Sequence, residues 1–386
     1  MKILSLNYEY PPLGGGAGAL SEDLNRQLAA AGHRVCVVTM HYPGLPKQET
    51  KDGVEIFRIP CLRKHRASCA PWEQLSYLIA LRRFMRTHPE LQRFDVCHSH
   101  FIVPTGLGAL KIRSRYGMPY ILTAHGSDVE GHNDKLSVRL IHRLIRGMWR
   151  RIVDGSYRTV SPSVMLKELM ARNYPSDRYR IIPNGIDIAA YAADMQEEIV
   201  PRNDDREKRP MLLLLGRMQE SKNFQTVLKA LNLVRPDGWH IELVGDGPYR
   251  KTLEAQAERL GLGSIVTFRG WVDHGSAEHT ELIRNAALFV SASRCENCPV
   301  AVLEAAAAGS TLILSDIPGH RSMMGDQALY FPADDVGELA KILRSELGKE
   351  RRRKHYDIRA FSWEAVVPLY EKLLTECAAA AGRSRG

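Results

Sequence analysis

The sequence contains no long apolar run. Apolar stretches such as Met211–Leu215 and Ala305–Ala308 are far shorter than the roughly 20 residues that a membrane-spanning helix requires, so a transmembrane protein is excluded. A secretory signal peptide is not indicated either, because the short apolar start of MKILSLNYEYPP is broken by Asn7 and Glu9 and predicts a first β-strand. We therefore expect a cytoplasmic protein.

Cysteine is scarce and odd in number, with seven residues among 386. This usage argues against the disulfide-rich secreted class and indicates reduced thiols. The segment Cys295-Glu-Asn-Cys298 has the spacing of a zinc or redox pair, but no second pair and no histidine stands beside it. Structural thiols are the favoured interpretation, and we predict neither a metal site nor a cofactor.

Two familiar nucleotide-binding motifs are also missing. No G-x-x-x-x-G-K-[ST] occurs, which excludes a P-loop protein. Gly14, Gly16 and Ala19 fit a loose G-x-G-x-x-A, but the second predicted strand ends Thr39-Met40-His41 without the acidic residue that would hold a ribose. A nicotinamide-dependent dehydrogenase is therefore disfavoured.

The composition is that of a globular protein with a basic surplus. Apolar residues make up 44% and charged residues 25% of the chain, which is enough for sizeable cores, and the length suggests two or three domains. Lysine and arginine outnumber aspartate and glutamate by 53 to 44. Such a surplus favours anionic partners, although no nucleic-acid-binding motif is present.

The apolar pattern predicts two doubly wound α/β domains. In the first 40 residues a strand, a glycine turn, a helix with leucines at 20, 24 and 28, and a second strand follow one another, and the alternation then continues. We predict an N-terminal, acceptor-side Rossmann-like domain over residues 1–187, a linker over 188–209, and a second Rossmann-like domain over 210–360. A C-terminal helix over 361–386 should return to the first domain and end in a tail.

In folds of this class ligands bind at the carboxyl ends of the strands. Gly14–Gly18 follows the first strand and could bring backbone N–H groups close to an anion, or simply form a tight turn. Gly216, Arg217 and Lys222 follow the first strand of the second domain, where an arginine fork and a lysine suit a diphosphate. A solvated basic loop is the alternative for this segment.

Two further strand-end segments carry titratable residues. Glu296 should lie in the loop before a helix that starts with Pro299, and Glu304 should lie about a turn and a half further along. One carboxylate could then meet a sugar and the other a ribose, while exposed N–H groups face phosphates. His125 ends a strand of the first domain, where it is either a structural group or an active-site residue.

Taken in order, eight motifs resemble the retaining family 4 glycosyltransferases, which have the GT-B fold of two Rossmann-like domains facing each other across a cleft. The resemblance covers roughly residues 1–375. The motifs are NYEYPPLGGGAG (7–18), TAHGSDV (123–129), SPSV (161–164), IPNGID (182–187), LLLLGRMQESKN (212–223), LVGDGP (243–248), FRGWV (268–272) and ENCPVAVLEAAAAG (296–309).

The resemblance implies transfer of a hexose-type sugar from a UDP- or GDP-sugar to an acceptor hydroxyl with retention at the anomeric carbon. It implies that Arg217 and Lys222 hold the donor diphosphate, that Glu304 binds the ribose, and that Glu296 and His125 contact the donor sugar. The implied donor-binding residues are further Gly15, Gly16, Gly216, Val272, Asn297, Cys298, Pro299 and Val300. Weaker candidates, on the acceptor side, are Asp128 and Asn184.

The implied chemistry needs neither a covalent carboxylate nor a metal, because Arg217 and Lys222 supply positive charge to the leaving diphosphate; no Asp-x-Asp occurs. Many members have Glu-Gly-Phe-Gly where this chain has Glu296-Asn-Cys-Pro299, so the sugar-holding loop differs. Two alternatives remain: a GT-B protein that binds sugar nucleotides without turnover, and another GT-B enzyme such as an epimerase or a phosphorylase.

Two basic segments concern the acceptor. Trp72–Arg86 and Arg139–Arg151 mix arginines with apolar residues and fit amphipathic helices that could lie on an anionic membrane surface. An ordinary packed helix with a solvated basic face is the alternative. A membrane-bound protein would suit a lipid-linked acceptor, as in envelope polysaccharide, lipopolysaccharide or glycolipid synthesis, and otherwise the acceptor would be a carbohydrate.

Overall fold

The protein, seen in a computed structural model, forms two compact units. The structure describes the backbone of residues 1–66, 68–132, 136–192, 209–349 and 352–383. The first unit comprises Met1–Gly185 and Trp363–Gly386, and the second comprises Ile186–Ser362. Each unit is described by itself.

The segment predicted as a linker differs from the structure at its start. Ile188–Tyr191 forms helix α6, and Tyr191 is buried in the core of the second unit. The first crossing between the units therefore follows Gly185, and the chain crosses back after Ser362. Residues 193–208 of the predicted linker lie outside the described residues.

The first unit contains an eight-stranded sheet in the order β3-β4-β2-β1-β5-β6-β7-β8. All neighbouring strands are parallel except β3 and β4. The strands are β1 (Lys2–Leu6), β2 (Arg34–Met40), β3 (Gln48–Lys51), β4 (Val54–Ile59), β5 (Val96–His100), β6 (Tyr120–Thr123), β7 (Thr159–Ser161) and β8 (Tyr179–Ile181).

The antiparallel pair β3–β4 was absent from the predicted alternation. Its turn is formed by Asp52 and Gly53, both with positive φ, and an Asp-Gly pair between two strands is a strong local signal for a hairpin. The pair adds an antiparallel edge to an otherwise parallel sheet, which the predicted strand–helix alternation did not include.

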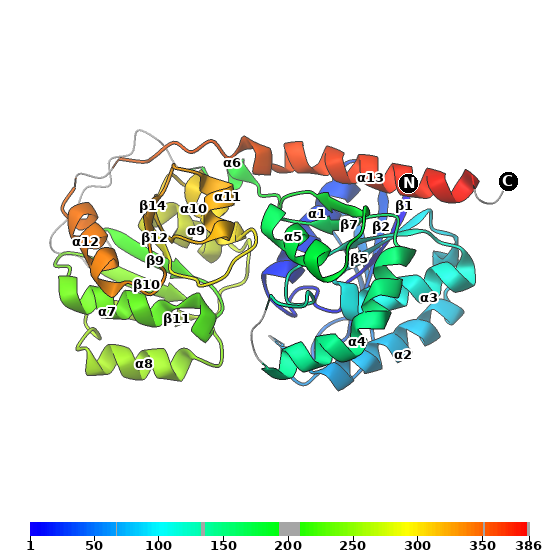
Figure 1. The fold of residues 1–386 in the computed structure, drawn as a ribbon, viewed down its shortest axis with the longest axis horizontal. Helices are drawn as coiled ribbons and strands as arrows, with labels where there is room; N and C mark the ends of the chain where they lie inside the picture. The colour runs from blue at the N-terminus through cyan, green and yellow to red at the C-terminus, as the bar shows by residue number, and fades with distance from the viewer. Residues whose placement is uncertain (67, 133–135, 193–208, 350–351, 384–386) are drawn as a thin grey trace. The chain divides into compact units, whose positions relative to one another are not determined.

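Helices cover both faces of the first sheet (Figure 1). α2, α3, α4 and α5 contribute to the core on one face, and α1 packs with α13, which also contacts β5 and β6. The helices are α1 (Gly16–Ala30), α2 (Pro71–Thr87), η1 (Leu91–Arg93), η2 (Ile102–Gly106), α3 (Leu107–Tyr116), α4 (Leu136–Gly155), α5 (Val164–Asn173) and α13 (Trp363–Arg383).

The second unit contains a six-stranded, fully parallel sheet in the order β11-β10-β9-β12-β13-β14. Its elements are α6, β9 (Met211–Leu215), η4 (Glu220–Lys222), α7 (Phe224–Val234), β10 (His240–Val244), α8 (Arg250–Arg259), β11 (Val266–Gly270), α9 (Ala277–Asn285), β12 (Ala286–Ser291), α10 (Val300–Ala307), β13 (Thr311–Ser315), α11 (Pro318–Met324), β14 (Leu329–Phe331), α12 (Val336–Leu347) and η5 (Arg359–Phe361).

The apolar run of β9 shows why this sheet is buried on both faces. Leu212 and Leu214 pack into a core with α7, α8 and α12, whereas Met211 and Leu213 pack into a core with α9, α10 and α11. Successive side chains point to opposite faces of a strand, so a continuous apolar run can fill two cores at once. Figure 1 shows the two helix layers on either side of the sheet.

Both sheets reverse their strand order next to the first strand of the unit. The reversal lies between β1 and β5 in the first unit and between β9 and β12 in the second. Loops leaving such a switch point diverge and form the usual ligand-binding crevice of open α/β sheets. Among the described helices, none combines the length and apolarity needed to cross a membrane.

Candidate active site

The switch point of the second unit carries an ion pair. Lys222, at the end of η4 after β9, places its Nζ against Oε1 of Glu296, in the loop after β12. The hydroxyl of Ser293 donates to the same carboxylate oxygen at 2.7 Å. An ion pair thus joins the two loops that diverge at the switch point. The predicted site residues Lys222 and Glu296 lie together, as expected.

Glu296 is held as a carboxylate. Burial raises its pKa, but the charge and hydrogen bond of Lys222 and the hydrogen bond of Ser293 together lower the pKa below its ordinary value. Because a buried charge is costly unless it is paired, the pair with Lys222 explains how Glu296 stays ionised. Lys222 is therefore shared between this carboxylate and any anion that binds nearby.

Arg217 differs from Lys222. Its side chain is half-buried directly after β9, and it makes no hydrogen bond or ion pair with any other residue in the described part of the chain. A guanidinium offers five N–H donors in a planar fork suited to phosphate oxygens. Of the two predicted cations, Arg217 is the one whose donors remain available to an anionic ligand.

Arg294 ties the Lys222 loop to the Glu296 loop. Its backbone N–H donates to the Ser221 carbonyl at 2.9 Å, and its guanidinium donates to the Glu220 carbonyl at 3.2 Å. The same guanidinium pairs with Asp334 at 2.8 Å, and this contact lowers the pKa of Asp334. The geometry of the ion pair is therefore set by the loops around it.

Backbone packing brings the strand-end loops close together. A Cβ at Gly245 would lie 2.1 Å from the Gly216 carbonyl oxygen, and a Cβ at Gly319 would lie 2.0 Å from that of Glu296. Both distances are far below a van der Waals contact, so only glycine fits without displacement. Gly216 thus helps to place the Arg217 loop, and Gly319, which the sequence analysis did not single out, lets α11 pack against the Glu296 loop.

His320 is a buried and uncharged histidine close enough to Glu296 for an electrostatic interaction. Its Nδ1 lies 2.9 Å from the Ser315 carbonyl, which can only accept, so Nδ1 carries the proton and Nε2 accepts from Ser291 Oγ at 3.1 Å. Burial lowers the pKa of His320, which keeps the imidazole uncharged. Sequence reasoning missed this residue, whose Pro-Gly-His context gives no local sign of the loop it supports.

Helix α10 begins one residue later than predicted. It starts at Val300 with Pro299 as the N-cap, so Pro299 precedes the first turn. The Cys298 side chain is buried in the apolar core that includes Val302 and Leu303. Cys298 can therefore meet a ligand only through its main chain, and Asn297 is also largely buried.

Glu304 is buried among histidines. Oε1 lies 2.8 Å from Nε2 of His274, and Oε2 lies 3.9 Å from Nε2 of His279. Burial raises the pKa of Glu304, but the hydrogen bond and charge of His274 and the charge of His279 lower it overall. Val272, one of the predicted donor-binding residues, lies two positions before His274 and packs at the edge of the α10 core.

The two histidines were not among the predicted site residues. His274 lies in the loop after β11, and His279 lies in the first turn of α9, whose N-cap is Ser276. Both contact a carboxylate that is 25 to 30 residues further along the chain. Two histidines close to the start of a predicted helix were the only local sign of a site in the sequence. That their partner is Glu304 is seen only in the folded structure.

In the first unit His125 follows β6, and Asp128 fixes its loop. Oδ1 of Asp128 accepts from the N–H groups of His125 and Gly126, each at 3.1 Å, and Oδ2 accepts from the N–H of Ile102 at 2.6 Å. Asp128 is buried. Its carboxylate thus accepts three backbone hydrogen bonds and fixes the His125 loop, and the contact between Asp128 and the acceptor stays a prediction.

His125 belongs to a chain of three neutral histidines. Its Nε2 lies 3.3 Å from Nδ1 of His100, and His98 Nε2 lies 2.8 Å from Thr123 Oγ1. Burial lowers the pKa of His125 to about 4, of His98 to about 3, and of His100 well below its usual value. At neutral pH these imidazoles can exchange hydrogen bonds with hydroxyls but carry no charge.

The glycine turn lies at the switch point of the first unit. Gly15 is the N-cap of α1 and Gly16 its first residue, and the Gly14 N–H donates to the Arg66 carbonyl at 2.8 Å. The turn packs on Glu9, whose carboxylate lies 3.7 Å from the buried Arg63 guanidinium. Gly15 and Gly16 thus belong to the first unit with His125, whereas the charged residues belong to the second.

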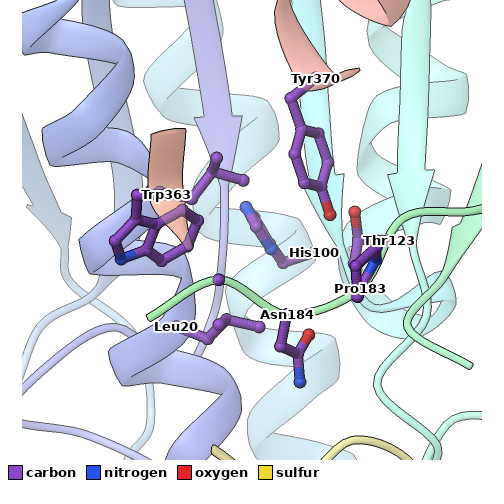
Figure 2. A pocket seen from close by; sticks show the side chains of 9 residues that line it. Leu20, His100, Thr123, Pro183, Asn184, Trp363 and Tyr370 are labelled. Atoms are coloured by element: carbon purple, nitrogen blue, oxygen red, sulfur yellow. The ribbon is translucent and has the colours of Figure 1, made fainter. Parts of the chain in front are cut away.

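Asn184 lines a small pocket of the first unit together with His100 and Thr123 (Figure 2). Trp363 and Tyr370, from α13, flank His100 in this view. The His100 Nε2 and the Trp363 Nε1 are buried and have no hydrogen-bond partner among the residues that the structure describes. The pocket is formed where the chain leaves the first unit and returns to it, so Asn184 is associated with this crossing.

The two basic segments differ in which side is buried. On α2 the side chains of Trp72, Leu75 and Ile79 are 69%, 58% and 50% exposed. Their spacing places these three side chains on one stripe of the helix, called the α2 stripe below. Three arginines further along the helix, Arg82, Arg83 and Arg86, are also exposed. On α4, Trp149 and two following residues are buried in the core. The second segment is therefore a packed helix with a basic outer face; side chains of 136–141 lie outside the described residues.

Two family models match the chain. The model described as Glycosyltransferase Family 4 matches residues 14–190, and the model described as Glycosyl transferases group 1 matches residues 195–363. Together they span both units, and their order along the chain is that of the resemblance noted from the motifs.

Relatives and solved structures agree with these matches. The chain is 26% identical over 355 residues to alpha-monoglucosyldiacylglycerol synthase from Streptococcus pneumoniae, which covers 87% of this chain and 76% of the relative. The structure of sucrose-phosphate synthase from Thermosynechococcus elongatus has a TM-score of 0.78 at 20% identity, covering 98% of this chain and 100% of that one. Anabaena HepE in complex with UDP-glucose has a TM-score of 0.69 at 16% identity, covering 100% and 99%.

The structural likeness extends over the whole length of these neighbours and comprises both parallel-sheet units, as expected for the GT-B fold. The motif order, the two Rossmann-like units and the two family models therefore lead to one conclusion: the chain belongs to the family 4 glycosyltransferases and is an enzyme of the GT-B fold.

Proposed function

We propose that this glycosyltransferase is a retaining, metal-independent hexosyltransferase. It moves a hexose-type sugar from a UDP- or GDP-sugar to an acceptor hydroxyl, in the synthesis of a cell-envelope polysaccharide, a lipopolysaccharide or a glycolipid. The observation that carries the proposal is the switch point of the second unit, where the loop after β9 carries both Lys222, paired with Glu296, and Arg217, whose guanidinium has no partner among the described residues.

The charges of this switch point suit departure of a diphosphate. When the anomeric bond breaks, negative charge grows on the leaving phosphate, and fixed cations stabilise that charge more in the transition state than in the ground state. Arg217 would hold the diphosphate, and Lys222 would add a second positive charge while it positions Glu296. These two side chains supply the positive charge for which other transferases use a metal, which is why we propose metal independence.

The buried carboxylates would bind the neutral parts of the donor. An ionised carboxylate accepts hydrogen bonds only, so Glu304 suits ribose hydroxyls and Glu296 suits hydroxyls of the sugar. We assign neither to a covalent intermediate. The N–H groups at the start of α10, around Asn297–Val300, would face the phosphates with the positive end of the helix dipole.

The first unit would supply uncharged groups that contact the donor sugar. His125 at a strand end, with Gly15 and Gly16 beside the neighbouring switch point, can contact sugar hydroxyls without adding charge near the electron-poor anomeric carbon. A neutral imidazole is suited to this role because an imidazolium would repel the positive charge that develops on the sugar.

A turnover screen tests the proposal. The purified chain is incubated with UDP- and GDP-hexoses, and release of the nucleotide is followed with and without carbohydrate and lipid-linked acceptors, in the presence of EDTA. We expect one donor to be hydrolysed slowly and transferred faster with an acceptor, and proton NMR of the product should show the donor's anomeric configuration.

Three outcomes would contradict the proposal. Binding of nucleotide sugars without any turnover would favour a sugar-nucleotide-binding protein, an inverted product would exclude the retaining mechanism, and loss of turnover in EDTA would exclude metal independence. An inverted or isomerised free nucleotide sugar would instead favour an epimerase.

The α2 stripe supports a lipid-linked acceptor and a peripheral membrane association. Exposed apolar side chains beside arginines match an anionic bilayer, since the apolar residues can enter the headgroup boundary while the arginines meet lipid phosphates. The relative from Streptococcus pneumoniae is named for synthesis of a glucosylated diacylglycerol, which is consistent with a lipid acceptor in this family.

Vesicle co-sedimentation tests the membrane association. We expect binding to vesicles with 30% phosphatidylglycerol, weaker binding to pure phosphatidylcholine, and a loss of about thirtyfold or more for the double variant Trp72→Ala, Leu75→Ala, since two buried apolar side chains at about 1–2 kcal/mol each contribute about 2–4 kcal/mol. The control Leu233→Ala removes an equally exposed leucine from the second unit. Equal binding to both vesicle types, or an equal loss in the control, would contradict the association.

A further inference from the structure

The cluster of His274, His279 and Glu304 has the chemistry of a metal site. Each residue offers one ligand atom, two imidazole nitrogens and a carboxylate oxygen, and these atoms all lie within 4.8 Å of one another. Two histidines with one carboxylate and an open fourth position are a donor set typical of zinc and related divalent metals. We propose that this cluster binds a divalent metal ion, Zn²⁺ most tightly, and that the bound metal blocks the donor site.

The distances require only small movements for coordination. At a metal–ligand distance of about 2.05 Å, tetrahedral geometry separates two ligand atoms by about 3.3 Å. The separations between the carboxylate and the two imidazoles bracket this value: 2.8 Å from Oε1 to His274 Nε2, and 3.9 Å from the other oxygen, Oε2, to His279 Nε2. A metal between the three side chains would replace the direct His274–Glu304 contact with two coordinate bonds.

The surroundings of the cluster support ligand orientation and entry. His279 and Glu304 are buried, and the hydroxyl of Tyr191 lies 3.4 Å from Nδ1 of His279. The Gly275 N–H also donates to Nδ1 at 3.4 Å. A metal at Nε2 would therefore move the proton to Nδ1 at the expense of this long contact, and the Nδ1–H could then donate to the Tyr191 hydroxyl, the kind of outer contact that orients ligating histidines. The His274 side chain is 30% exposed, so a metal and its fourth ligand, a water molecule, can enter from this side.

The ligand types also predict selectivity. Imidazole nitrogen suits Zn²⁺, Co²⁺ and Ni²⁺, whereas Mg²⁺ and Ca²⁺ prefer oxygen ligands. The cluster should therefore bind Zn²⁺ and Co²⁺ but not Mg²⁺. This metal is inhibitory in our proposal, and it is distinct from the catalysis proposed above, which uses Arg217 and Lys222.

The blocking effect rests on the proposed function, in which Glu304 accepts hydrogen bonds from the donor ribose. A carboxylate oxygen that coordinates a metal no longer offers that lone pair, and the positive charge of the metal makes the other oxygen a weaker acceptor for a hydroxyl. Metal and nucleotide should therefore compete, so that saturating Zn²⁺ weakens nucleotide binding by about tenfold, the scale of one hydrogen bond to a charged group.

Calorimetric titration with zinc chloride, on the full chain without nucleotide, tests the site itself. We expect one tight equivalent in wild type, a loss of at least about tenfold in affinity for His274→Ala and for His279→Gln, and no heat with magnesium chloride. Because His274 is partly exposed, His274→Ala should fold normally, which circular dichroism checks. Co²⁺ should give the visible absorption of a four-coordinate ion in wild type and lose it in His274→Ala.

Two controls separate this site from other metal-binding groups. His355→Gln removes an exposed histidine of the same unit, and Cys295→Ser removes the exposed thiol of the cysteine pair; both should bind Zn²⁺ like wild type. Absence of a stoichiometric equivalent, or an equal affinity in His274→Ala, would overturn the metal site. Loss of binding in Cys295→Ser would assign the metal to the cysteine pair instead and would also overturn it.

A second titration distinguishes failure of the metal site from failure of the donor assignment. UDP and GDP are titrated into wild type and His274→Ala, each with and without Zn²⁺. We expect Zn²⁺ to weaken nucleotide binding in wild type but not in His274→Ala. Tight zinc binding with unchanged nucleotide affinity would overturn the blocking effect and the ribose role of Glu304, while nucleotide binding without any zinc binding would leave the proposed function standing and refute the metal site.

Discussion

The two units share a fold but differ in the charge of their switch-point loops. In the second unit the loops after β9 and β12 carry a paired lysine and glutamate and the Arg217 guanidinium, which makes no ion pair with the described residues. In the first unit the loop after β1 carries Glu9, which pairs with Arg63, and the strand ends after β5 and β6 carry His100 and His125, imidazoles that burial keeps neutral. The comparison teaches that two units with the same sheet architecture can present different charges at their strand ends, because the loops alone set the electrostatics.

The largest expected effect comes from removing the free cation. Arg217→Ala should lower kcat/KM for sugar transfer by about 10²–10³-fold, the loss typical of a group that stabilises transition-state charge. The fold should survive, because Arg217 makes no ion pair with the described residues. Steady-state rates of nucleotide release measure the effect.

Arg359→Ala is the matched control, since Arg359 is an exposed arginine of the same unit paired with Asp357 at the surface. Its rate should equal that of wild type. If Arg217→Ala also turned over at a near-normal rate, the charged role of the second unit would be wrong. Lys222→Ala is a less clean variant, because it leaves the buried Glu296 carboxylate without its partner.

The next effect tests the neutral role of the first unit. His125→Ala should lower kcat by about 10²-fold while the Kd of the free nucleotide stays within about twofold of wild type, because His125 would contact the sugar and not the diphosphate. Rates and calorimetry on the same preparations give both quantities.

His65→Ala removes an exposed histidine of the same unit and should change neither quantity. A large loss of nucleotide affinity in His125→Ala, with little change in kcat, would contradict the neutral role of the first unit. It would mean that both units contribute to phosphate binding.

A steric change should have a smaller effect. Gly319→Ala places a methyl group against the Glu296 carbonyl, which must move the loop. Overpacking of this kind costs about 1–3 kcal/mol, so we expect a lower unfolding midpoint and a rate reduced by roughly tenfold. Gly348→Ala, where an added Cβ meets no atom within 4 Å, is the control, and an equal rate in both variants would show that the Glu296 loop tolerates displacement.

The last expected effect concerns stability and pH and leaves the rate of sugar transfer at neutral pH unchanged. In the unfolded chain a histidine takes up its proton near pH 6.5, whereas burial lowers the pKa of His98 to about 3 and of His125 to about 4 in the folded unit. Their contribution to stability is therefore complete above pH 6.5 and is lost as the pH falls toward 4. Each such histidine adds up to about 1.4 kcal/mol per pH unit to the slope.

Urea unfolding between pH 7 and 4.5 measures this slope, and His98→Gln should flatten it relative to wild type. His355→Gln, which removes an exposed histidine of the second unit, should leave it unchanged. A wild-type slope that His98→Gln does not alter would mean that other groups, chiefly carboxyls, account for the pH dependence.

Much of the architecture could be predicted because its signals are local. The β9 run and the leucines of α1 carry their own periodicity, and Gly216, Arg217 and Glu296 stand directly beside recognisable strand or helix ends. The β3–β4 hairpin had a local Asp-Gly signal as well, and it was missed only because the alternating βα pattern dominated that part of the sequence.

The rest of the site depends on contacts between segments far apart in the sequence. His274 and Glu304, Gly319 and Glu296, and Asp128 with the N–H of Ile102 each join elements that only the folded sheet brings together. Cys298 shows the same limit at a single residue, since its position in the motif is plain but the direction of its side chain into the core is not.

The central claim is that the second unit binds the donor through its diphosphate. The direct test compares UDP, UMP and uridine, and the matching guanosine series, for binding to wild type and to Arg217→Ala by calorimetry. We predict that the diphosphate of one series binds wild type at least about tenfold more tightly than the monophosphate, the scale of one charge-assisted contact, and that Arg217→Ala abolishes this preference. An undiminished preference in Arg217→Ala, or equal binding of diphosphate and monophosphate to wild type, would contradict the claim.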